Sequence, residues 1–436
     1  MNNQMVSAQS AWEFLTEKSP ESVIRLNGQI IRRVVRRDGT ETATSFPKPK
    51  RRRGRPPTTL SQADADKALL MAAVKPPSSP ENAELSIVDL FCGIGGTSIG
   101  AIEAIRALGM NGRVQCAVDF DEQCVEQYRK NLAPDSCERL DLGEVSSLLG
   151  SPKTPTELKL IRSVPKKVDI LLGGPPCQGH SNLNNHTRRS DPKNELYFKM
   201  ARAAELLKPR VVFIENVPSV VNDKFKVVQR TIHGLISLGY KVSEGVVDTS
   251  LIGVAQTRKR HILIATATDD EWFKKIRVPS VTEIVHRHNV DPRPVMWAID
   301  DLIDIERDQL IDEVFGMADE TRDRVDFLFD NDLYDLPDHK RPDCHKNGHT
   351  YPSVYGRLHP EKPSPTITSG FFTMGQGRFV HPSRRSTLTA HEAARIQFIP
   401  DWFDWSDFTT RQALSKAIGN AVPPKLSYVF VLELFR

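Results

Sequence analysis

One cysteine in this sequence stands in a setting that suits chemistry better than packing. Residues 173–181 read Gly-Gly-Pro-Pro-Cys-Gln-Gly-His-Ser and follow a short apolar segment. Two consecutive prolines fix the backbone, so we expect the side chain of Cys177 to stand at the end of a strand. A lone cysteine is more often a small core residue. The rigid, glycine-flanked turn instead predicts a reactive thiol, because a thiolate is a strong nucleophile.

A second group of residues could bind a cofactor that contains adenosine. Residues 89–96 read Asp-Leu-Phe-Cys-Gly-Ile-Gly-Gly, and glycines between a strand and a helix let a ligand approach the backbone. Asp119 ends the next predicted strand and could accept hydrogen bonds from both ribose hydroxyls, although a helix N-cap is an equal alternative. Asp141 could meet the adenine amino group. The spacing suits NAD and FAD as well as other adenosine cofactors, so it does not choose among them.

Glu215 follows the apolar run 211–214, which reads Val-Val-Phe-Ile. A carboxyl group beside an apolar strand end can have a raised pKa and donate a proton. The alternative is a structural ion pair. Glu215 is therefore a second candidate for catalysis.

These residues require a scaffold that brings strand ends together. Short apolar runs alternate with helical patterns, which predicts an α/β fold with a mostly parallel sheet covered on both faces. Ligands of such sheets bind at the carboxyl ends of the strands, where the residues above lie. The expected strands are 85–91, 113–119, 168–172, 211–215, 240–248 and 261–265. The expected helices are 97–108, 121–131, 195–207, 224–238, 390–396 (with Thr389 as N-cap), 410–417 and 425–435.

Charge is distributed unevenly along the 436 residues. Residues 1–80 carry 14 Lys and Arg against 7 Asp and Glu. Residues 300–338 carry 15 acidic and 3 basic side chains, and residues 339–385 carry 8 basic and 2 acidic ones. Positive charge concentrated in a terminal stretch indicates contact with a polyanion, although a solvated tail is the alternative. Because Pro, Ser, Thr, Lys and Arg dominate 40–80, we expect residues 1–84 to be mostly disordered. Residues 12–15 and 23–35 suggest a short structured piece within this stretch.

The remaining composition indicates a protein of a reducing compartment. The sequence has no apolar run of 18 residues and no signal-peptide pattern, which predicts no membrane span and a cytoplasmic location. Six cysteines without a CxxC pair predict free thiols and no metal site. Cys344, His345 and His349 lie close together, but no second ligand pair accompanies them.

Six short motifs occur in a fixed order, and together they carry a family resemblance. They are 89–96, Pro-Pro-Cys-Gln at 175–178, Glu-Asn-Val at 215–217, Gln-Thr-Arg-Lys-Arg at 256–260, 357–369 with Pro-Thr-Ile-Thr at 365–368, and Gly-Asn-Ala-Val at 419–422. The chain resembles the cytosine-5 DNA methyltransferases over residues 85–267 and 355–436. Each motif alone is weak, whereas the ordered set is specific.

The resemblance implies a Rossmann-like class I methyltransferase fold, S-adenosylmethionine as cofactor and double-stranded DNA as substrate. It implies that Cys177 adds to a cytosine swung out of the helix. The implied catalytic residues are Cys177, Glu215, Arg258 and Arg260, with Arg258 favoured over Arg260 as the direct participant. The implied cofactor-binding residues are Phe91, Gly93, Gly95, Gly96, Asp119, Phe120, Asp141, Leu142, Asn420 and Val422.

The resemblance also suggests how the chain is divided. We expect a basic tail over 1–84, a catalytic core over 85–270, a target-recognition region over 271–386, and C-terminal helices over 387–436 that return to the core. Within the recognition region, the acidic stretch 300–338 should face away from DNA, and the basic stretch 339–385 should face it. The expected DNA contacts are Gln178, Ser181, Lys340, Arg341, Lys346, Arg378, Arg384 and Arg385. In the tail, 47–57 resembles an AT-hook, in which Arg53 and Arg55 would follow a narrow minor groove.

Three alternatives remain open. A tRNA cytosine-5 methyltransferase shares the core, but its usual Cys-Phe-Thr signature is absent here. Enzymes that methylate exocyclic amines carry an aromatic residue where this chain has Cys177. A catalytically inactive DNA-binding regulator is the third alternative, although every matched catalytic position is intact. We expect a monomer, and a cognate restriction endonuclease is a further possible partner.

Overall fold

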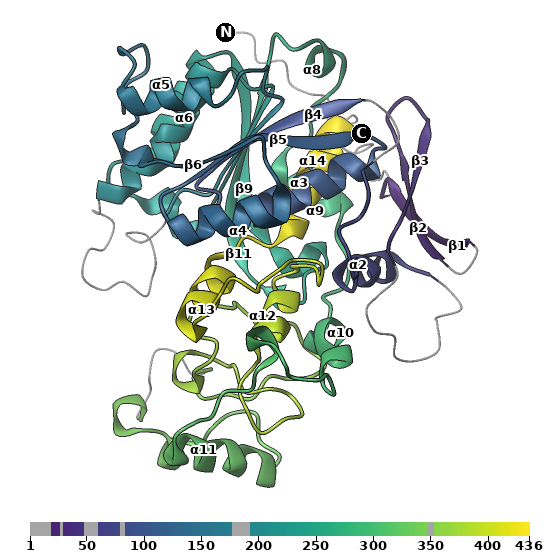
Figure 1. Cartoon of the computed structure of the whole chain (residues 1–436), viewed down its shortest axis with the longest axis vertical. Helices are drawn as coiled ribbons and strands as arrows, with labels where there is room; N and C mark the ends of the chain where they lie inside the picture. The colour runs from purple at the N-terminus through teal and green to yellow at the C-terminus, as the bar shows by residue number, and fades with distance from the viewer. Residues whose placement is uncertain (1–18, 27–28, 48–59, 79–82, 177–191, 347–352) are drawn as a thin grey trace.

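The computed structural model describes residues 19–26, 29–47, 60–78, 83–176, 192–346 and 353–436. An upper part is built around a large twisted sheet, and a lower part of short helices and irregular segments lies beneath it (Figure 1). Most of the regular secondary structure is in the upper part. Among the described residues, no helix has both the length and the apolar character needed to cross a membrane.

The central sheet has seven strands in the order β6-β5-β4-β7-β8-β11-β9. Strands β4, β5, β6, β7 and β8 pair in parallel, and β11 runs antiparallel to both of its neighbours, β8 and β9. The sheet is therefore mostly parallel, and the predicted α/β, Rossmann-like fold class is confirmed. The strands are β4 Glu84–Leu90, β5 Asn111–Asp119, β6 Ser136–Arg139, β7 Ile170–Gly173, β8 Val211–Asn216, β9 Tyr240–Asp248 and β11 Lys259–Ala267.

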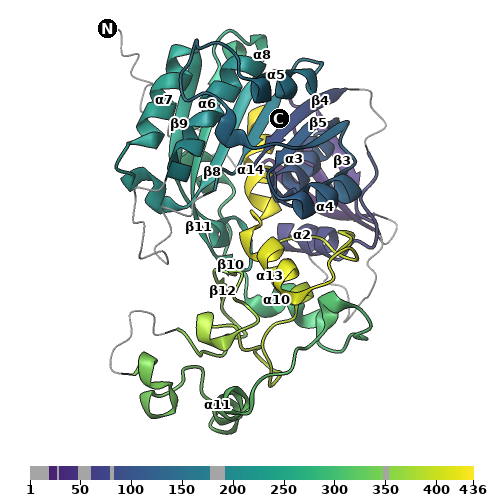
Figure 2. The ribbon, with the colours of Figure 1, turned by 60° about the vertical axis from the view of Figure 1, so that its left-hand side comes forward.

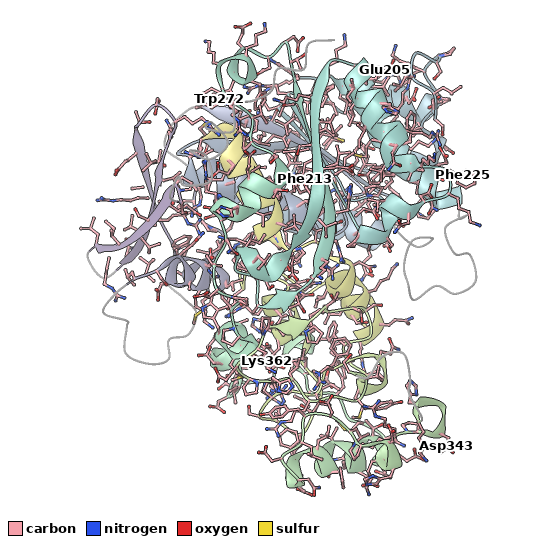
Figure 3. All side chains as sticks on the ribbon, turned by 180° about the vertical axis from the view of Figure 1, so that it is seen from behind. Glu205, Phe213, Phe225, Trp272, Asp343 and Lys362 are labelled. Carbon is pink, nitrogen blue, oxygen red and sulfur yellow. The ribbon has the colours of Figure 1, made fainter. Side chains whose placement is uncertain are left out.

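Alternating apolar residues bury both faces of this sheet, as expected of strands covered on two sides. One face packs against α3 (Gly96–Ala107), α4 (Glu122–Leu132) and α14 (Pro424–Phe435). The other face packs against α5 (Pro155–Arg162), α6 (Leu196–Leu207) and α7 (Val227–Ser237). Phe213 of β8 points toward the first face, where its ring lies 5.7 Å from that of Phe430 in α14 (Figure 3). The C-terminal helix is thus part of the sheet's core.

The prediction that residues 1–84 are mostly disordered is wrong for the described part of that stretch. β1 (Glu21–Leu26), β2 (Gln29–Val35) and β3 (Glu41–Ser45) form an antiparallel sheet, followed by α2 (Gln62–Leu70). Arg32 of β2 is 1% exposed and lies within 3.3 Å of the carboxylates of Glu21, Asp66 and Glu103. Because the positive charge of Arg32 pairs with these buried carboxylates, this arginine-rich segment packs against the rest of the upper part.

The lower part joins the upper part through a short parallel pair of strands. β10 (Gln256–Thr257) pairs with β12 (Ser364–Pro365), close to α13 (Arg411–Asn420) (Figure 2). The other helices after the sheet are α8 Glu271–Lys275, α9 Val281–Arg287, α10 Val295–Ile299, α11 Asp319–Asp330 and α12 Ala390–Ile396. Thr389 caps α12 by accepting a hydrogen bond from the backbone N–H of Glu392, as predicted.

Candidate active site

The glycine loop between β4 and α3 has a backbone that most residues avoid. Phe91, Gly93 and Gly95 have φ values of 57°, 53° and 90°, in the left-handed region. A glycine adopts this conformation at little cost, whereas Phe91 is strained there. Strain of this kind is often concentrated at functional sites. The loop therefore has the geometry of a ligand cradle at the carboxyl end of the sheet.

Asp119 stabilises this loop from the neighbouring strand. Its carboxylate accepts hydrogen bonds from the backbone N–H groups of Gly93, at 2.8 Å, and of Asp121, at 2.9 Å. Burial raises the pKa of Asp119. Asp121, rather than Asp119, is the N-cap of α4, since it accepts from the N–H of Gln123. The N-cap alternative for Asp119 is therefore wrong, and its carboxylate lies beside the glycine loop.

Asp89, at the base of the same loop, is a functional candidate that sequence reasoning missed. Its side chain is 1% exposed and accepts hydrogen bonds from Thr97 Oγ1 at 3.1 Å and Ser98 Oγ at 2.7 Å. Burial raises the pKa of Asp89 to about 7. Both hydroxyls belong to the first turn of α3, so Asp89 holds the helix against the strand. The position of this acid within the glycine motif was the available signal.

The C-terminal motif lies directly against the glycine loop. A methyl group added at Gly96 would come within 2.2 Å of the carbonyl oxygen of Val422, so only glycine fits at this position. Ser427 donates a hydrogen bond to the carbonyl of Thr97 at 2.7 Å. Asn420 ends α13 and is exposed near this contact. Residues more than 300 positions apart in sequence thus build one end of the site.

The other predicted cofactor residues stand at the ends of β5 and β6. Phe120 is 64% exposed, and the guanidinium of Arg139 lies 5.8 Å from its ring centroid. Asp141 caps a short 3₁₀ turn by accepting from the N–H of Gly143 at 2.8 Å, and Leu142 is buried beneath it. An exposed aromatic ring beside these strand ends is suited to stacking against a planar base.

Glu215 and Arg260 form an ion pair at the carboxyl end of β8. Glu215 Oε1 lies 2.6 Å from Arg260 Nε, and the two side chains are 9% and 12% exposed. The antiparallel register of β8 and β11 pairs Asn216 with His261, which places the two charged residues on adjacent strands. Two residues that the sequence predicts as catalytic are thus in direct contact.

Arg258 has a different environment from the one predicted. It is 3% exposed and donates hydrogen bonds to the carbonyls of Ile367, at 2.9 Å, and of Gly419, at 3.3 Å. The expectation that Arg258 rather than Arg260 acts directly is therefore not supported. Its guanidinium joins backbone segments, whereas Arg260 meets Glu215.

Asn216 holds the turn that leads to the predicted nucleophile, and sequence reasoning missed this role. Its side-chain amide donates to the carbonyl of Pro175 at 3.1 Å, and its oxygen accepts from the N–H of Val217 at 2.8 Å. The position of Asn216 directly after Glu215 was the available signal. Several predicted site residues lie outside the described part of the chain: Cys177, Gln178, Ser181, Arg53 and Arg55.

Gly174 marks the point where these segments converge. A methyl group at this residue would lie 3.7 Å from Glu215 Oε2 and 4.0 Å from both the carbonyl oxygen of Phe91 and Val422 Cγ2. The cysteine turn, the glycine loop, the C-terminal motif and the Glu215–Arg260 pair therefore surround one location. A cofactor on the loop and a substrate held by Glu215 would meet there.

The comparisons with known proteins agree with this geometry. The sequence profile of the C-5 cytosine-specific DNA methylase family matches residues 85–436. The type II methyltransferase M1.BsuMI of Bacillus subtilis (strain 168) is 39% identical over 418 residues, which cover 93% of each chain. The type II methylase M.HgiDII of Herpetosiphon aurantiacus is 28% identical and covers 80% of this chain and 95% of that protein.

The chain belongs to this family. It is a DNA (cytosine-5)-methyltransferase, and its family consists of methyltransferases that use S-adenosylmethionine. The fold agrees: the crystal structure of the S. pombe Dnmt2 methyltransferase matches with a TM-score of 0.53 at 17% identity, covering 80% of this chain and 98% of that one. Neither a tRNA substrate nor an inactive regulator has better support than DNA methylation.

In this methyltransferase the charges of the lower part are arranged differently from the prediction. The acidic and basic stretches, expected to face apart, contact each other. Arg385 lies 3.0 Å from Asp326 and 2.6 Å from Asp330, both on α11. The reason is that opposite charges in one small folded region attract at contact distance, which an argument from phosphate repulsion alone overlooks.

Two other predicted phosphate contacts also have carboxylate partners. Arg378 pairs with Asp335, and Arg384 donates both terminal nitrogens to Glu392 at 2.8 Å. Glu392 is buried, so Arg384 balances a charge inside the protein. The prediction that Arg384 contacts phosphate is therefore not supported, because binding DNA would leave that carboxylate unpaired.

The remaining predicted contacts among the described residues are Lys340, Arg341 and Lys346, and Lys346 lies 2.6 Å from the carboxylate of Asp343. Lys340 is exposed, and its ammonium lies 4.8 Å from the ring centroid of Phe327. Arg341 donates to the carbonyl of Leu336 at 2.7 Å. Lys340 is thus presented to solvent by an aromatic contact, and it remains a candidate for phosphate binding.

Proposed function

We propose that this methyltransferase acts on a cytosine swung out of duplex DNA, with Cys177 as nucleophile and the Glu215–Arg260 pair as the site that holds the base. The observation that carries the proposal is the 2.6 Å contact between Glu215 and Arg260 beside Gly174, three residues before Cys177. A carboxyl group fixed by an arginine can direct its second oxygen at the exocyclic amine of cytosine and, when protonated, can donate a hydrogen bond to ring nitrogen 3. Glu215 Oε2 points toward Gly174, the location where the segments converge.

The chemistry follows from the electronic character of cytosine. Carbon 5 is a weak nucleophile until a thiolate adds to carbon 6 and moves electron density toward it. In the proposal, the thiolate of Cys177 forms that bond, the carboxyl group of Glu215 donates a proton to ring nitrogen 3, and Arg260 stabilises the negative charge that develops. Carbon 5 then forms a bond to the methyl group, a base removes the proton from carbon 5, and the bond between carbon 6 and the sulfur of Cys177 breaks to release the thiolate. Asn216 keeps the turn in place by bonding Pro175.

The residues around the glycine loop fit S-adenosylmethionine. Gly96 lacks the side chain that would strike Val422, and Asp119 lies beside the loop as a fixed carboxylate that can accept ribose hydroxyls. Phe120 offers an exposed ring, and Asp141 stands at the end of β6. S-adenosylmethionine supplies an electrophilic methyl group when bound. Phe91, Gly93, Gly95, Leu142 and Asn420 complete the proposed binding set.

The test is covalent trapping on duplex DNA that contains 5-fluorocytosine, in the presence of S-adenosylmethionine. Fluorine at carbon 5 cannot leave as a cation, so the adduct persists and migrates with the protein in a denaturing gel. The wild type and the control variant Cys124→Ser should form the adduct, whereas Cys177→Ser should not. An adduct of unchanged yield with Cys177→Ser would overturn the assignment.

The proposal extends to the partners. The type II names of the two bacterial relatives support a defined duplex recognition sequence and a cognate restriction endonuclease. We expect the protein to act as a monomer. Bisulfite sequencing of DNA from a host that expresses the protein gives the recognition sequence, and methylation scattered over unrelated contexts would contradict a defined site.

A further inference from the structure

Two buried glutamines meet at the junction of the upper and lower parts. Gln256 and Gln397 are both 0% exposed, and Gln256 Nε2 donates to Gln397 Oε1 at 2.8 Å. Gln256 belongs to β10 and Gln397 follows α12, so the pair joins segments that are 141 residues apart. Among the described residues, no hydrogen bond joins either glutamine to Glu215 or Arg260.

Each glutamine uses its second polar atom to bind a third segment. Gln256 Oε1 accepts from the N–H of Ile367, at 2.7 Å, in the chain that follows β12. Gln397 Nε2 donates to the carbonyl of Ile418, at 2.8 Å, near the end of α13. The pair therefore connects the strand that leads to Arg260, the lower part, and the turn that leads to Val422.

Arg258 makes a second connection between the same segments. It follows β10 and donates to the carbonyls of Ile367 and Gly419. Gly419 allows no side chain, because a methyl group there would lie 2.2 Å from the backbone nitrogen of Ser369. The turn before Val422 is thus in direct backbone contact with the chain of the lower part.

This arrangement links two sites through groups that are costly to separate. A buried amide loses hydrogen bonds that water cannot replace if one of its partners moves. A shift of Val422 caused by a ligand on the glycine loop would therefore move Ile418, Gln397 and Gln256 together. Conversely, if DNA binding moved the lower part, the same contacts would transmit that movement to Val422. Two sites that bias one common element are energetically coupled, and the coupling is reciprocal.

We propose that Gln256 and Gln397 are positioning residues that couple cofactor binding at the glycine loop to DNA binding beside Arg260 and the lower part. This inference rests on the proposed cofactor site. The pair touches neither ligand. It sets the position of the Val422 turn relative to the strand that carries Arg260, so that each ligand is bound more tightly when the other is present.

The experiment measures the dissociation constant of duplex DNA with and without saturating S-adenosylhomocysteine, a stable analogue of the cofactor. The ratio of the two constants is the coupling factor. For the wild type we expect a ratio of at least about tenfold, within the range common for coupled sites. In Gln397→Met the ratio should fall to about one or two, while the affinity for S-adenosylhomocysteine without DNA stays close to that of the wild type.

Gln115 provides a matched control. It is 1% exposed and also bonds two backbone groups, the carbonyl of Lys167 at 2.9 Å and the N–H of Lys166 at 3.2 Å, away from the strand ends that form the site. Gln115→Met should lower the melting temperature but leave the coupling ratio unchanged. Loss of coupling in Gln115→Met would show a general effect of destabilisation and would overturn the proposal.

Two further variants keep the test decisive. If Gln397→Met does not fold, Gln256→Glu removes the donor that reaches Gln397 and the carbonyl of Ile396 and retains the acceptor for Ile367, so the same loss of coupling is expected. A wild-type ratio near one, or a full ratio in a folded variant, refutes the inference. Asn420→Ala tests the proposed cofactor site separately: unchanged cofactor affinity in that variant counts against the cofactor site, whatever the glutamine variants do.

Discussion

The upper and lower parts of this methyltransferase are held together by different forces. In the upper part, alternate residues of each strand bury apolar side chains against helices on two faces, and the tilted contact between the rings of Phe213 and Phe430 is one example. In the lower part, a small apolar cluster that includes Leu328 and Val380 is supplemented by exposed ion pairs, such as the one between Arg385 and Asp330 at the end of α11. Apolar burial fixes geometry independently of salt and pH, whereas exposed charges respond to both. In our proposal, the upper part carries out the chemistry and the lower part contacts DNA.

The largest expected effect comes from the catalytic pair in the upper part. Replacing Glu215 by Gln removes the ion pair with Arg260 while preserving the size of the side chain. We expect kcat to fall by at least about 100-fold, the contribution of a positioned acid or base. Methyl transfer to duplex DNA under single-turnover conditions measures this, with the exposed Glu126→Gln as control. Activity within a few-fold of the wild type would show that the pair is only structural.

The second effect concerns the N-terminal sheet and helix α2, which buried ion pairs attach to the core. Asp66 is 0% exposed and lies within 3.3 Å of cationic groups of Arg32, Arg293 and Lys425. Asp66→Ala leaves these cations without their shared partner, which we expect to cost about 3–5 kcal/mol in the free energy of unfolding.

Urea denaturation checks this value, and the exposed Glu41→Ala serves as control. A change no larger than that of the control would mean that the N-terminal sheet contributes nothing to the stability of the core. In that case, residues 1–84 would again be interpreted as a tail that is independent of the core.

The third effect is a dependence of the free energy of unfolding on pH, which arises at His391 near the boundary between the two parts. Burial lowers the pKa of His391, but its hydrogen bonds to Asp312, at 2.7 Å, and Asp401, at 2.9 Å, outweigh burial and raise it to about 8. Because the folded-state pKa lies above the ordinary value of about 6.5, the stabilisation is complete below pH 6.5 and is lost as pH rises through 8.

The shift corresponds to about 2 kcal/mol. His391→Gln should flatten the dependence of unfolding free energy on pH between 6 and 9, while the exposed His286→Gln should leave it unchanged. Identical pH profiles for the wild type and His391→Gln would refute the proton-linked contact.

The smallest effect concerns the exposed pairs on α11. Replacing Asp326 and Asp330 by Asn releases Arg385 from both partners. We expect little change in stability, because exposed pairs contribute little. The affinity for DNA at low salt should rise, and the slope of log affinity against log salt should steepen by about 0.9 if Arg385 then reaches one phosphate. An unchanged slope would place Arg385 away from DNA.

The sequence predicted the catalytic half well because its local signals agree with one another. Strand β4 was expected at 85–91 and spans Glu84–Leu90, and helix α3 was expected at 97–108 and spans Gly96–Ala107. In this half, apolar alternation, the glycine loop and the helical pattern all indicate the same element boundaries. The order of the elements then placed Glu215 and the glycine loop at one edge of the sheet.

The N-terminal sheet was missed because its stabilising partners are remote. The strand Gln29–Val35 contains two adjacent arginines, which locally resemble a solvated tail. The carboxylates that bury Arg32 lie 34 and 71 residues further along the chain, at Asp66 and Glu103. No local pattern predicts that such charges become partners.

The different surroundings of Arg258 and Arg260 could not be predicted for another reason. Two residues apart on a strand, they should point the same way. The chain is interrupted between them, since β10 ends at Thr257 and β11 begins at Lys259. Because of this break, the side chain of Arg258 donates hydrogen bonds to the carbonyls of Ile367 and Gly419, whereas Arg260 lies beside Glu215.

The contact between Gly96 and Val422 has a consequence for the synthesis of the protein. The glycine loop is translated early, whereas the backbone around Val422 that packs against it is translated more than 300 residues later. The pocket therefore stays incomplete while the intervening residues are synthesised. Helix α14 is translated after all the strands of the sheet, and until then one face of the sheet lacks one of the helices that cover it. The order of translation thus delays completion of the proposed pocket until the segment with Val422 has been synthesised.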